Sequence, residues 1–258
     1  MKLRIKFSKH GSMKFVGHLD IMRYFQKALR RAEIDVALTD GFSPHQKMSF
    51  ALPLGLGLCS NGEYFDVQLN SYTTPENVMK RLDKQMNDEI KILSVTVLED
   101  KAGKAMSMVK AADYSVVMKE EYLDKVYEID GKTYTGRDVW DSLINSLPDF
   151  LLQKEIIVLK KTKKSEREID IKPLIYYMSV KEIRVNSKEN KCIFLKVSQG
   201  SENNLKPEMV IEQMCKYIKM KMDIFAYQYT REELYSYDEE KIEYIPLGDY
   251  GERFVNEI

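Results

Sequence analysis

Alternating apolar and polar side chains predict β-strands in the first hundred residues of the chain. Leu3, Ile5 and Phe7 fall on one face of the first strand, and the basic side chains between them fall on the other. The strands and extended segments predicted here are Lys2–Ser8, Asp35–Leu38, His45–Leu52, Tyr64–Leu69 and Ile90–Leu98.

Apolar side chains recur every three or four residues over His18–Glu33, which predicts an amphipathic helix. A second helix is predicted over Pro75–Asn87, where Thr74 is suited to the N-cap position. The resulting order is β-α-β-β-α-β. That order is typical of a ferredoxin-like domain, in which both helices cover one face of a four-stranded antiparallel sheet.

The second half of the chain repeats this order of elements more loosely. Polar residues fill 99–108, which we interpret as a linker, and Pro148 is expected to end a helix that starts at Gly136. Residues 163–185 are expected to begin as a charged loop. We therefore predict an α+β protein with two tandem ferredoxin-like domains and antiparallel sheets. The domains span 1–98 and 109–235, and a C-terminal tail covers 236–258.

Charge is balanced over the whole chain, with 40 basic and 40 acidic side chains, but it is uneven along it. The first 50 residues carry ten Lys or Arg side chains and four Asp or Glu side chains. Such a local excess attracts phosphate even in a neutral protein. The sequence therefore favours an anionic partner for the N-terminal domain.

Cysteine spacing argues against a disulfide framework, an iron–sulfur cluster or a zinc site, because Cys59, Cys192 and Cys215 form no CxxC pair. We accordingly expect no cofactor and no metal. The N-terminus has no apolar signal-peptide core, and no run approaches roughly 18 apolar residues. These features predict a cytoplasmic protein that does not associate with a membrane.

Basic side chains of the first domain are the candidates for nucleic-acid binding, on the open face of the sheet and on the first helix. RNA-binding domains of this topology use the open sheet face. The candidate residues are Lys2, Arg4, Lys6, Arg23, Lys27, Arg30, Arg31 and Lys47. An ordinary solvated helix face, with an ion pair between Asp20 and Arg23, remains the alternative for the helical residues.

All three histidines occur in the first 45 residues, as His10, His18 and His45. His18 falls at the predicted start of a helix, where the dipole favours the neutral imidazole needed by a general base. His18, His45 and Asp20 are therefore the candidate catalytic residues. The alternative for His18 is a histidine packed at the edge of the domain.

The loop that precedes His45 has an unusual composition. Gly41 permits positive φ, and Pro44 holds Ser43 in an extended conformation. We expect Gly41, Phe42, Ser43 and Pro44 to form a rigid loop that presents His45 and Lys47. A simple tight β-turn is the alternative.

Several segments of the N-terminal half resemble a bacterial family of unknown function, the radical-SAM-linked proteins. They are the K-x-G-x-x-x-F-V-G-H-L-D-I-M-R run from Lys9, A-L-R-R-A at 28–32, G-F-S-P-H-Q-K-M-S-F-A-L-P-L at 41–54 and S-N-G-E-Y at 60–64. Residues 169–174 resemble the family's I-D-x-x-P-L segment. The resemblance implies a radical SAM protein as partner and an RNA-related setting, and it implies no activity. This chain lacks the CxxxCxxC motif of the radical SAM enzymes themselves.

These observations favour an RNA-binding or substrate-presenting accessory protein that acts with a radical SAM enzyme in RNA modification or a ribosome-related setting. One alternative is a metal-independent RNA-processing enzyme, a ribonuclease that uses His18 and His45 as acid and base. The other alternative is a protein-interaction scaffold.

Overall fold

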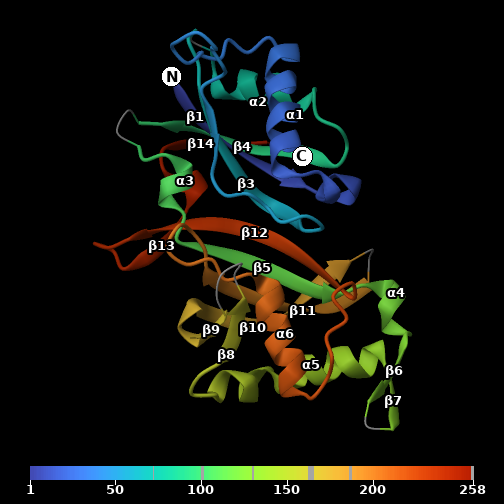
Figure 1. The fold of residues 1–258 in the computed structure, drawn as a ribbon. Helices are drawn as coiled ribbons and strands as arrows, with labels where there is room; N and C mark the ends of the chain where they lie inside the picture. Colours follow the sequence, from blue (N-terminus) through green and yellow to red (C-terminus); the bar gives the residue numbers. More distant parts are fainter. Residues whose placement is uncertain (72, 100–101, 130, 162–165, 186–187, 257–258) are drawn as a thin grey trace. The chain divides into compact units, whose positions relative to one another are not determined.

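The computed structural model describes every residue except 72, 100–101, 130, 162–165, 186–187 and 257–258 (Figure 1). The described chain forms two compact units. Unit 1 consists of 1–112, 200–202 and 230–258, and unit 2 consists of 113–199 and 203–229. None of the described helices combines the length and the hydropathy required to span a membrane.

Unit 1 contains the predicted β-α-β-β-α-β order. Its elements are β1 (Lys2–Lys9), α1 (His18–Arg31), β2 (Met48–Phe50), β3 (Cys59–Gln68), α2 (Pro75–Asp83), β4 (Ile90–Leu98), α3 (Ala105–Met108), β13 (Glu243–Pro246) and β14 (Glu252–Val255), with 3-10 turns at Gly11–Phe15 and Leu247–Asp249. The strands are hydrogen-bonded in the order β14-β4-β1-β3, and β2 also pairs with β3. All of these pairs are antiparallel.

The apolar face of β1 supports the core of unit 1. Leu3, Ile5 and Phe7 are at most 1% exposed, as the alternating pattern predicts. The ring centroid of Phe7 lies 4.6 Å from that of Phe25 on α1 and 6.0 Å from that of Phe65 on β3. Residues of α2 and β4 complete the same apolar cluster. Burial of these side chains therefore holds both helices on one face of the sheet.

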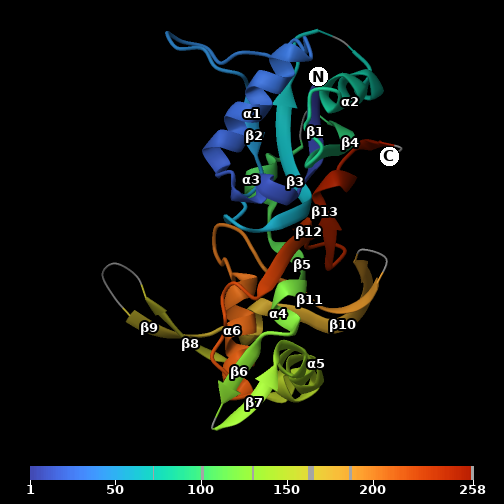
Figure 2. The ribbon, with the colours of Figure 1, turned by 90° about the vertical axis from the view of Figure 1, so that its right-hand side faces the viewer.

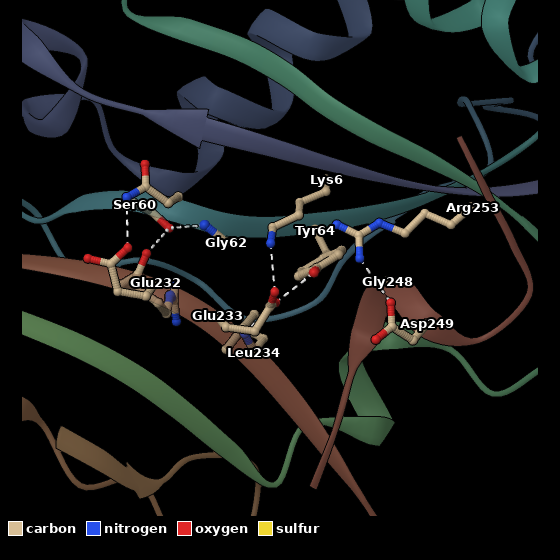
Figure 3. Close-up of polar contacts among 12 residues, drawn as sticks. Lys6, Ser60, Gly62, Tyr64, Glu232, Glu233, Leu234, Gly248, Asp249 and Arg253 are labelled. Atoms are coloured by element: carbon tan, nitrogen blue, oxygen red, sulfur yellow. Dashed lines mark hydrogen bonds and ion pairs between the residues drawn. The ribbon is translucent and has the colours of Figure 1, made fainter. Parts of the chain in front are cut away.

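The C-terminal segment enters the sheet of unit 1 beside β3. β12 (Tyr227–Asp238) passes from unit 2 into unit 1 at Thr230, and it runs parallel to β3 there, with Arg231 opposite Ser60. Gly62 makes this approach possible, because a Cβ atom at this position would lie 2.5 Å from the carbonyl oxygen of Glu232. Figure 3 shows Gly62 of β3 and Glu232 of β12.

Unit 2 is built on strands that are hydrogen-bonded in the order β10-β11-β5-β12. Its elements are β5 (Ala111–Met118), α4 (Glu120–Leu123), β6 (Val126–Ile129), β7 (Lys132–Thr135), α5 (Gly136–Leu152), β8 (Ile157–Lys161), β9 (Glu166–Asp170), a 3-10 turn at Lys172–Leu174, β10 (Ile175–Val185), β11 (Lys188–Ser198) and α6 (Pro207–Tyr217). The β6–β7 and β8–β9 hairpins form two separate small sheets (Figure 2). α5 and α6 pack against each other, with Phe150 and Tyr217 in edge contact.

Tertiary packing overrides two local predictions in unit 2. α5 continues through Pro148 to Leu152, because Leu147 and Phe150 are buried and Lys172 donates to the carbonyl oxygens of Leu151 and Gln153 at the helix end. Of the segment expected to begin as a charged loop, residues 163–165 lie outside the described residues, and 166–185 contain β9 and β10, which pair with β8 and β11.

The expected linker and tail also contain structure. α3 lies within 99–108, and the carbonyl oxygen of Gly103 accepts a hydrogen bond from Arg4. Residues 230–258, expected in the second domain and a tail, belong to unit 1 because β14 pairs with β4 and β12 pairs with β3.

Replacing Gly62 with alanine should destabilise unit 1 by about 1–3 kcal/mol, the usual range for overpacking, because the new Cβ atom meets backbone atoms of Glu232 and Glu233. Gly55→Ala is the matched control, because there the Cβ atom would make only ordinary contact with Leu58. Its effect should stay within about 0.5 kcal/mol. Urea denaturation measures both free energies, and equal values would show that β3 and β12 tolerate a wider spacing.

Candidate functional site

Arg4 of β1 is not part of an exposed basic face. Its side chain is buried, with Nε 2.8 Å from Oδ1 of Asp66 and Nη2 3.1 Å from Oδ2. It also donates to the carbonyl oxygens of Leu247 and Gly103, at 3.0 and 2.9 Å. The expectation of an exposed Arg4 is therefore wrong, because α3 and the 3-10 turn at Leu247 cover this part of the sheet.

Lys6 is occupied in a similar way. Its Nζ atom lies 2.6 Å from Oε2 of Glu233, and Tyr64 donates its hydroxyl to Oε1 of the same carboxylate at 2.6 Å (Figure 3). Burial first, and the nearby Glu233 carboxylate second, raise the pKa of Tyr64 well above its usual value, so the phenol stays protonated and donates. Lys6 therefore joins β1 to β12 instead of facing an open sheet surface.

Lys2 and Lys47 lie together at the other end of this sheet face. Lys2 is opposite Gln68 in the β1–β3 register, and the Lys47 carbonyl oxygen accepts a hydrogen bond from the Gln68 N–H at 3.1 Å. Both lysines line one cavity. The predicted basic sheet face is thus reduced to its Lys2 and Lys47 end.

Basic residues of α1 are exposed along the outer face of the helix. Arg23 donates to Oδ1 of Asp20 at 2.9 Å, the ion pair foreseen as the alternative. Arg31 donates to the side-chain and backbone oxygens of Gln85, both at 3.2 Å, and so ties α1 to the segment after α2. Lys27 and Arg30 extend from the same helix into solvent. The basic residues of α1 therefore offer the accessible positive charge that Arg4 and Lys6 of β1 do not.

His18 lies at the first position of α1, half-buried over the aromatic core. Its ring meets Phe50 edge to face, with centroids 5.4 Å apart. Burial lowers the pKa of His18; the Glu63 carboxylate opposes this effect, and the Lys9 ammonium adds to it. A small cavity of about 10 Å³ lies beside the ring. The residues that line it are Phe7, Lys9, His18, Ile21, Phe50, Leu54 and Glu63.

Beneath His18, three charged side chains are buried together. Arg231 of β12 donates to both carboxylate oxygens of Glu63, at 2.8 and 3.0 Å, and Lys9 donates to the Val16 carbonyl oxygen at 2.9 Å. Burial lowers the pKa of Lys9; Glu63 raises it and Arg231 lowers it. No pattern in the sequence indicated this group, although Lys9 and Glu63 both belong to the segments that resemble the family.

Neighbouring polar residues extend this group. His10 Nε2 lies 2.8 Å from Oδ1 of Asn61, and Asn61 donates its amide to Oε2 of Glu232 at 2.7 Å. Because the Asn61 amide nitrogen donates to Glu232, its oxygen accepts, and His10 carries its proton on Nε2. Three segments distant in sequence are thereby joined by one hydrogen-bonded chain.

His45 lies apart from this group, on an exposed loop. Thr39 holds it: the Thr39 N–H donates to the His45 carbonyl oxygen at 2.8 Å, and the His45 N–H donates to the Thr39 hydroxyl at 3.1 Å. Gly41 has a φ of +106°, as its position in a tight loop requires, and Phe42 between it and Ser43 is fully exposed. The described contacts of His18, Asp20 and His45 join none of the three to another.

The chemistry open to the His18 group is limited by space. The cavity of about 10 Å³ beside the imidazole has room for about one water molecule. Burial also raises the pKa of the Cys59 thiol, which disfavours the nucleophilic thiolate. Over the described residues, no group of three or more His, Cys, Asp or Glu side chains has a metal-binding arrangement.

The chain matches the family described as "Uncharacterized protein conserved in bacteria (DUF2344)" over residues 2–207. No curated protein matches it. The matched range includes His18, Lys9 and Glu63, whereas Arg231 lies beyond it.

Acidification should destabilise the protein through His18. Its folded-state pKa is lowered, so the unfolded chain binds more protons near its ordinary value of 6.5. Stability from the neutral imidazole is present above that value and is lost as the pH falls through it toward the folded-state pKa. His18→Gln should therefore reduce the loss of unfolding free energy between about pH 7.5 and pH 5.5.

His45→Gln is the matched control, because His45 is exposed. Glu63 and Lys9 are unchanged in both variants, so their contribution to the pH profile is common to both. If the unfolding free energy of His18→Gln changed with pH as that of the wild type does, His18 would not be the residue that makes the protein sensitive to acid.

Proposed function

This chain belongs to that uncharacterised bacterial family, and we propose that it is a cytoplasmic RNA-binding accessory protein that acts with a radical SAM enzyme. The observation that carries the RNA-binding part is the row of exposed cations on α1. Arg23, Lys27, Arg30 and Arg31 follow one another at spacings of four, three and one residues, which place them on one side of a helix.

Phosphate binding suits this surface better than the sheet face proposed from the sequence. Arg4 and Lys6 are engaged within unit 1, whereas the side chains of Lys27 and Arg30 are exposed on a helix held rigidly by the aromatic core. Cationic side chains on a helix can contact the phosphate backbone of a nucleic acid. Such contacts supply most of the sequence-independent affinity of a protein for a nucleic acid. The surface therefore favours backbone contact over reading of individual bases.

Strand order supports a ferredoxin-like interpretation of both units. In unit 1, β2-β3-β1-β4 is the order of neighbours, and in unit 2, β10-β11-β5-β12 repeats it when the two inserted hairpins are left out. The radical SAM partner rests only on the family resemblance of the segments from Lys9 to Tyr64 and of residues 169–174. RNA modification or another ribosome-related process is the setting that the same resemblance implies.

RNA binding should weaken with salt and depend on α1. Each phosphate contact to single-stranded RNA contributes about −0.7 to the slope of log K against log salt. Lys27→Ala with Arg30→Ala should therefore make the slope shallower by about 1.4. Arg31 is left intact because it also holds Gln85. Fluorescence anisotropy with a labelled RNA without a 5′-phosphate measures affinity at several salt concentrations.

The matched control removes two exposed lysines of unit 2, Lys154→Ala with Lys221→Ala. It should keep the slope of the wild type. An RNA affinity that does not change with salt concentration, or that falls equally in both double variants, would overturn the proposal. Cleavage of the RNA during the measurement, lost in His18→Ala, would favour the RNA-processing alternative instead.

The exposed loop at 39–45 offers a contact for the protein partner. Phe42 is fully exposed on a loop closed by Thr39 and His45, and exposed aromatic anchors dominate many interfaces. Phe42→Ser should weaken the complex with the proposed radical SAM partner by about 2 kcal/mol, roughly 30-fold. Leu152→Ser, at an exposed leucine of unit 2, is the control.

Titration of the purified partner by calorimetry measures both affinities after nuclease treatment, which removes any bridging RNA. The partner part of the proposal fails if the two purified proteins do not associate. It also fails at this loop if Phe42→Ser binds as tightly as Leu152→Ser.

A further inference from the structure

A cavity of about 380 Å³ lies in unit 1 on the face of the sheet opposite to α1. The residues that line it are Lys2, Lys47, Met48, Ser49, Asp66, Val67, Gln68, Leu98, Ala102, Gly103 and Lys104. They come from β1, β2, β3, β4 and the segment before α3. Its volume is within the range of sites that bind small molecules.

The charged side chains of this cavity make it positive. Lys47 and Lys104 come from separate segments, and Lys2 adds a third ammonium group to the lining. Asp66 is the single carboxylate among the lining residues. Its oxygens already bind Arg4 at 2.8 and 3.1 Å and the Ala105 N–H at 2.8 Å. Over the described residues, the Asp66 carboxylate therefore pairs with Arg4 and not with Lys47 or Lys104.

The floor of the cavity is apolar. Leu98 is buried beneath it, on the face of the sheet that Lys2 occupies, and Ala102 is half-buried at its side. Ser49 and Gln68 add a hydroxyl and an amide that can donate or accept hydrogen bonds. An occupant therefore needs an anionic group for the lysines and a compact body with apolar faces and a few polar edges.

We propose that this cavity binds a nucleoside 5′-phosphate, with the phosphate between Lys47 and Lys104 and the nucleoside against Leu98. A phosphate monoester carries up to two negative charges, one for each of these two ammonium groups. The same chemistry is presented by a free mononucleotide and by the 5′-terminal nucleotide of an RNA. The cavity is on the other face of the sheet from α1, so the inference does not depend on RNA binding by that helix.

Calorimetric titration with the four ribonucleoside 5′-monophosphates, each compared with its nucleoside, tests the site. At least one nucleotide should bind, and its nucleoside should bind markedly more weakly. Lys47→Ala with Lys104→Ala should weaken nucleotide binding by about 10-fold or more, because two charged contacts are lost. The Lys27→Ala and Arg30→Ala variant should bind the nucleotide as the wild type does.

Ala102→Trp separates the cavity from its surface charge, because it fills the space and keeps all three lysines. It should abolish binding while thermal unfolding of the protein is unchanged. If a 5′-phosphorylated RNA competes with the nucleotide and the same RNA with a 5′-hydroxyl does not, the natural ligand is an RNA terminus. Competition by neither RNA identifies a free mononucleotide.

The proposal would be overturned if neither the four nucleotides nor the phosphorylated RNA bound. It would also be overturned if a nucleotide and its nucleoside bound equally well, or if the Lys47→Ala/Lys104→Ala and Ala102→Trp variants both kept the wild-type affinity. Because RNA binding by α1 is measured with RNA that lacks the 5′-phosphate, failure at the cavity leaves that proposal standing, and the reverse also holds.

Discussion

The ion pair between Glu63 and Arg231 is the interaction on which the rest of unit 1 depends. Both side chains are buried, and each would be a costly unpaired charge without the other. Their contact requires β12 to lie against β3, and Gly62 permits that spacing by having no side chain. A carboxylate held at this point also faces Lys9 and His18, so the electrostatics beneath α1 follow from the same pair.

Internal pairing decides which of the cations of unit 1 remain accessible. Arg4 and Lys6 alternate with the apolar residues of β1, yet Asp66 and Glu233 hold them within the fold. The outer face of α1 and the cavity bordered by Lys47 and Lys104 do carry accessible positive charge. These two surfaces lie on opposite faces of one sheet, and they are the places at which we propose that unit 1 binds an anion.

Predictability of the candidate site differs from residue to residue. The position of His18 at the start of a helix follows from the spacing of Met22, Phe25 and Leu29, and the structure has it there. The exposed loop at Gly41–His45 follows from Gly41 and Pro44. Lys9 and Glu63 gave no comparable signal, because a charged residue in an alternating strand is indistinguishable from a solvated one until a covering segment is known. That segment contains Arg231, 168 positions from Glu63.

By itself, the sequence determined the local elements of unit 1, because the period of apolar residues decides which face of a strand or helix is buried. It could not determine how far α5 runs past Pro148, or that β9, β10, β13 and β14 form, because pairing and packing with distant segments outweigh local propensity there. Tertiary structure alone decided which polar residues are covered. The last thirty residues of the chain pack against the sheet of unit 1, and their position decides the burial of Arg4, Lys6, Glu63 and Arg231. No local sequence pattern predicts where this C-terminal segment packs.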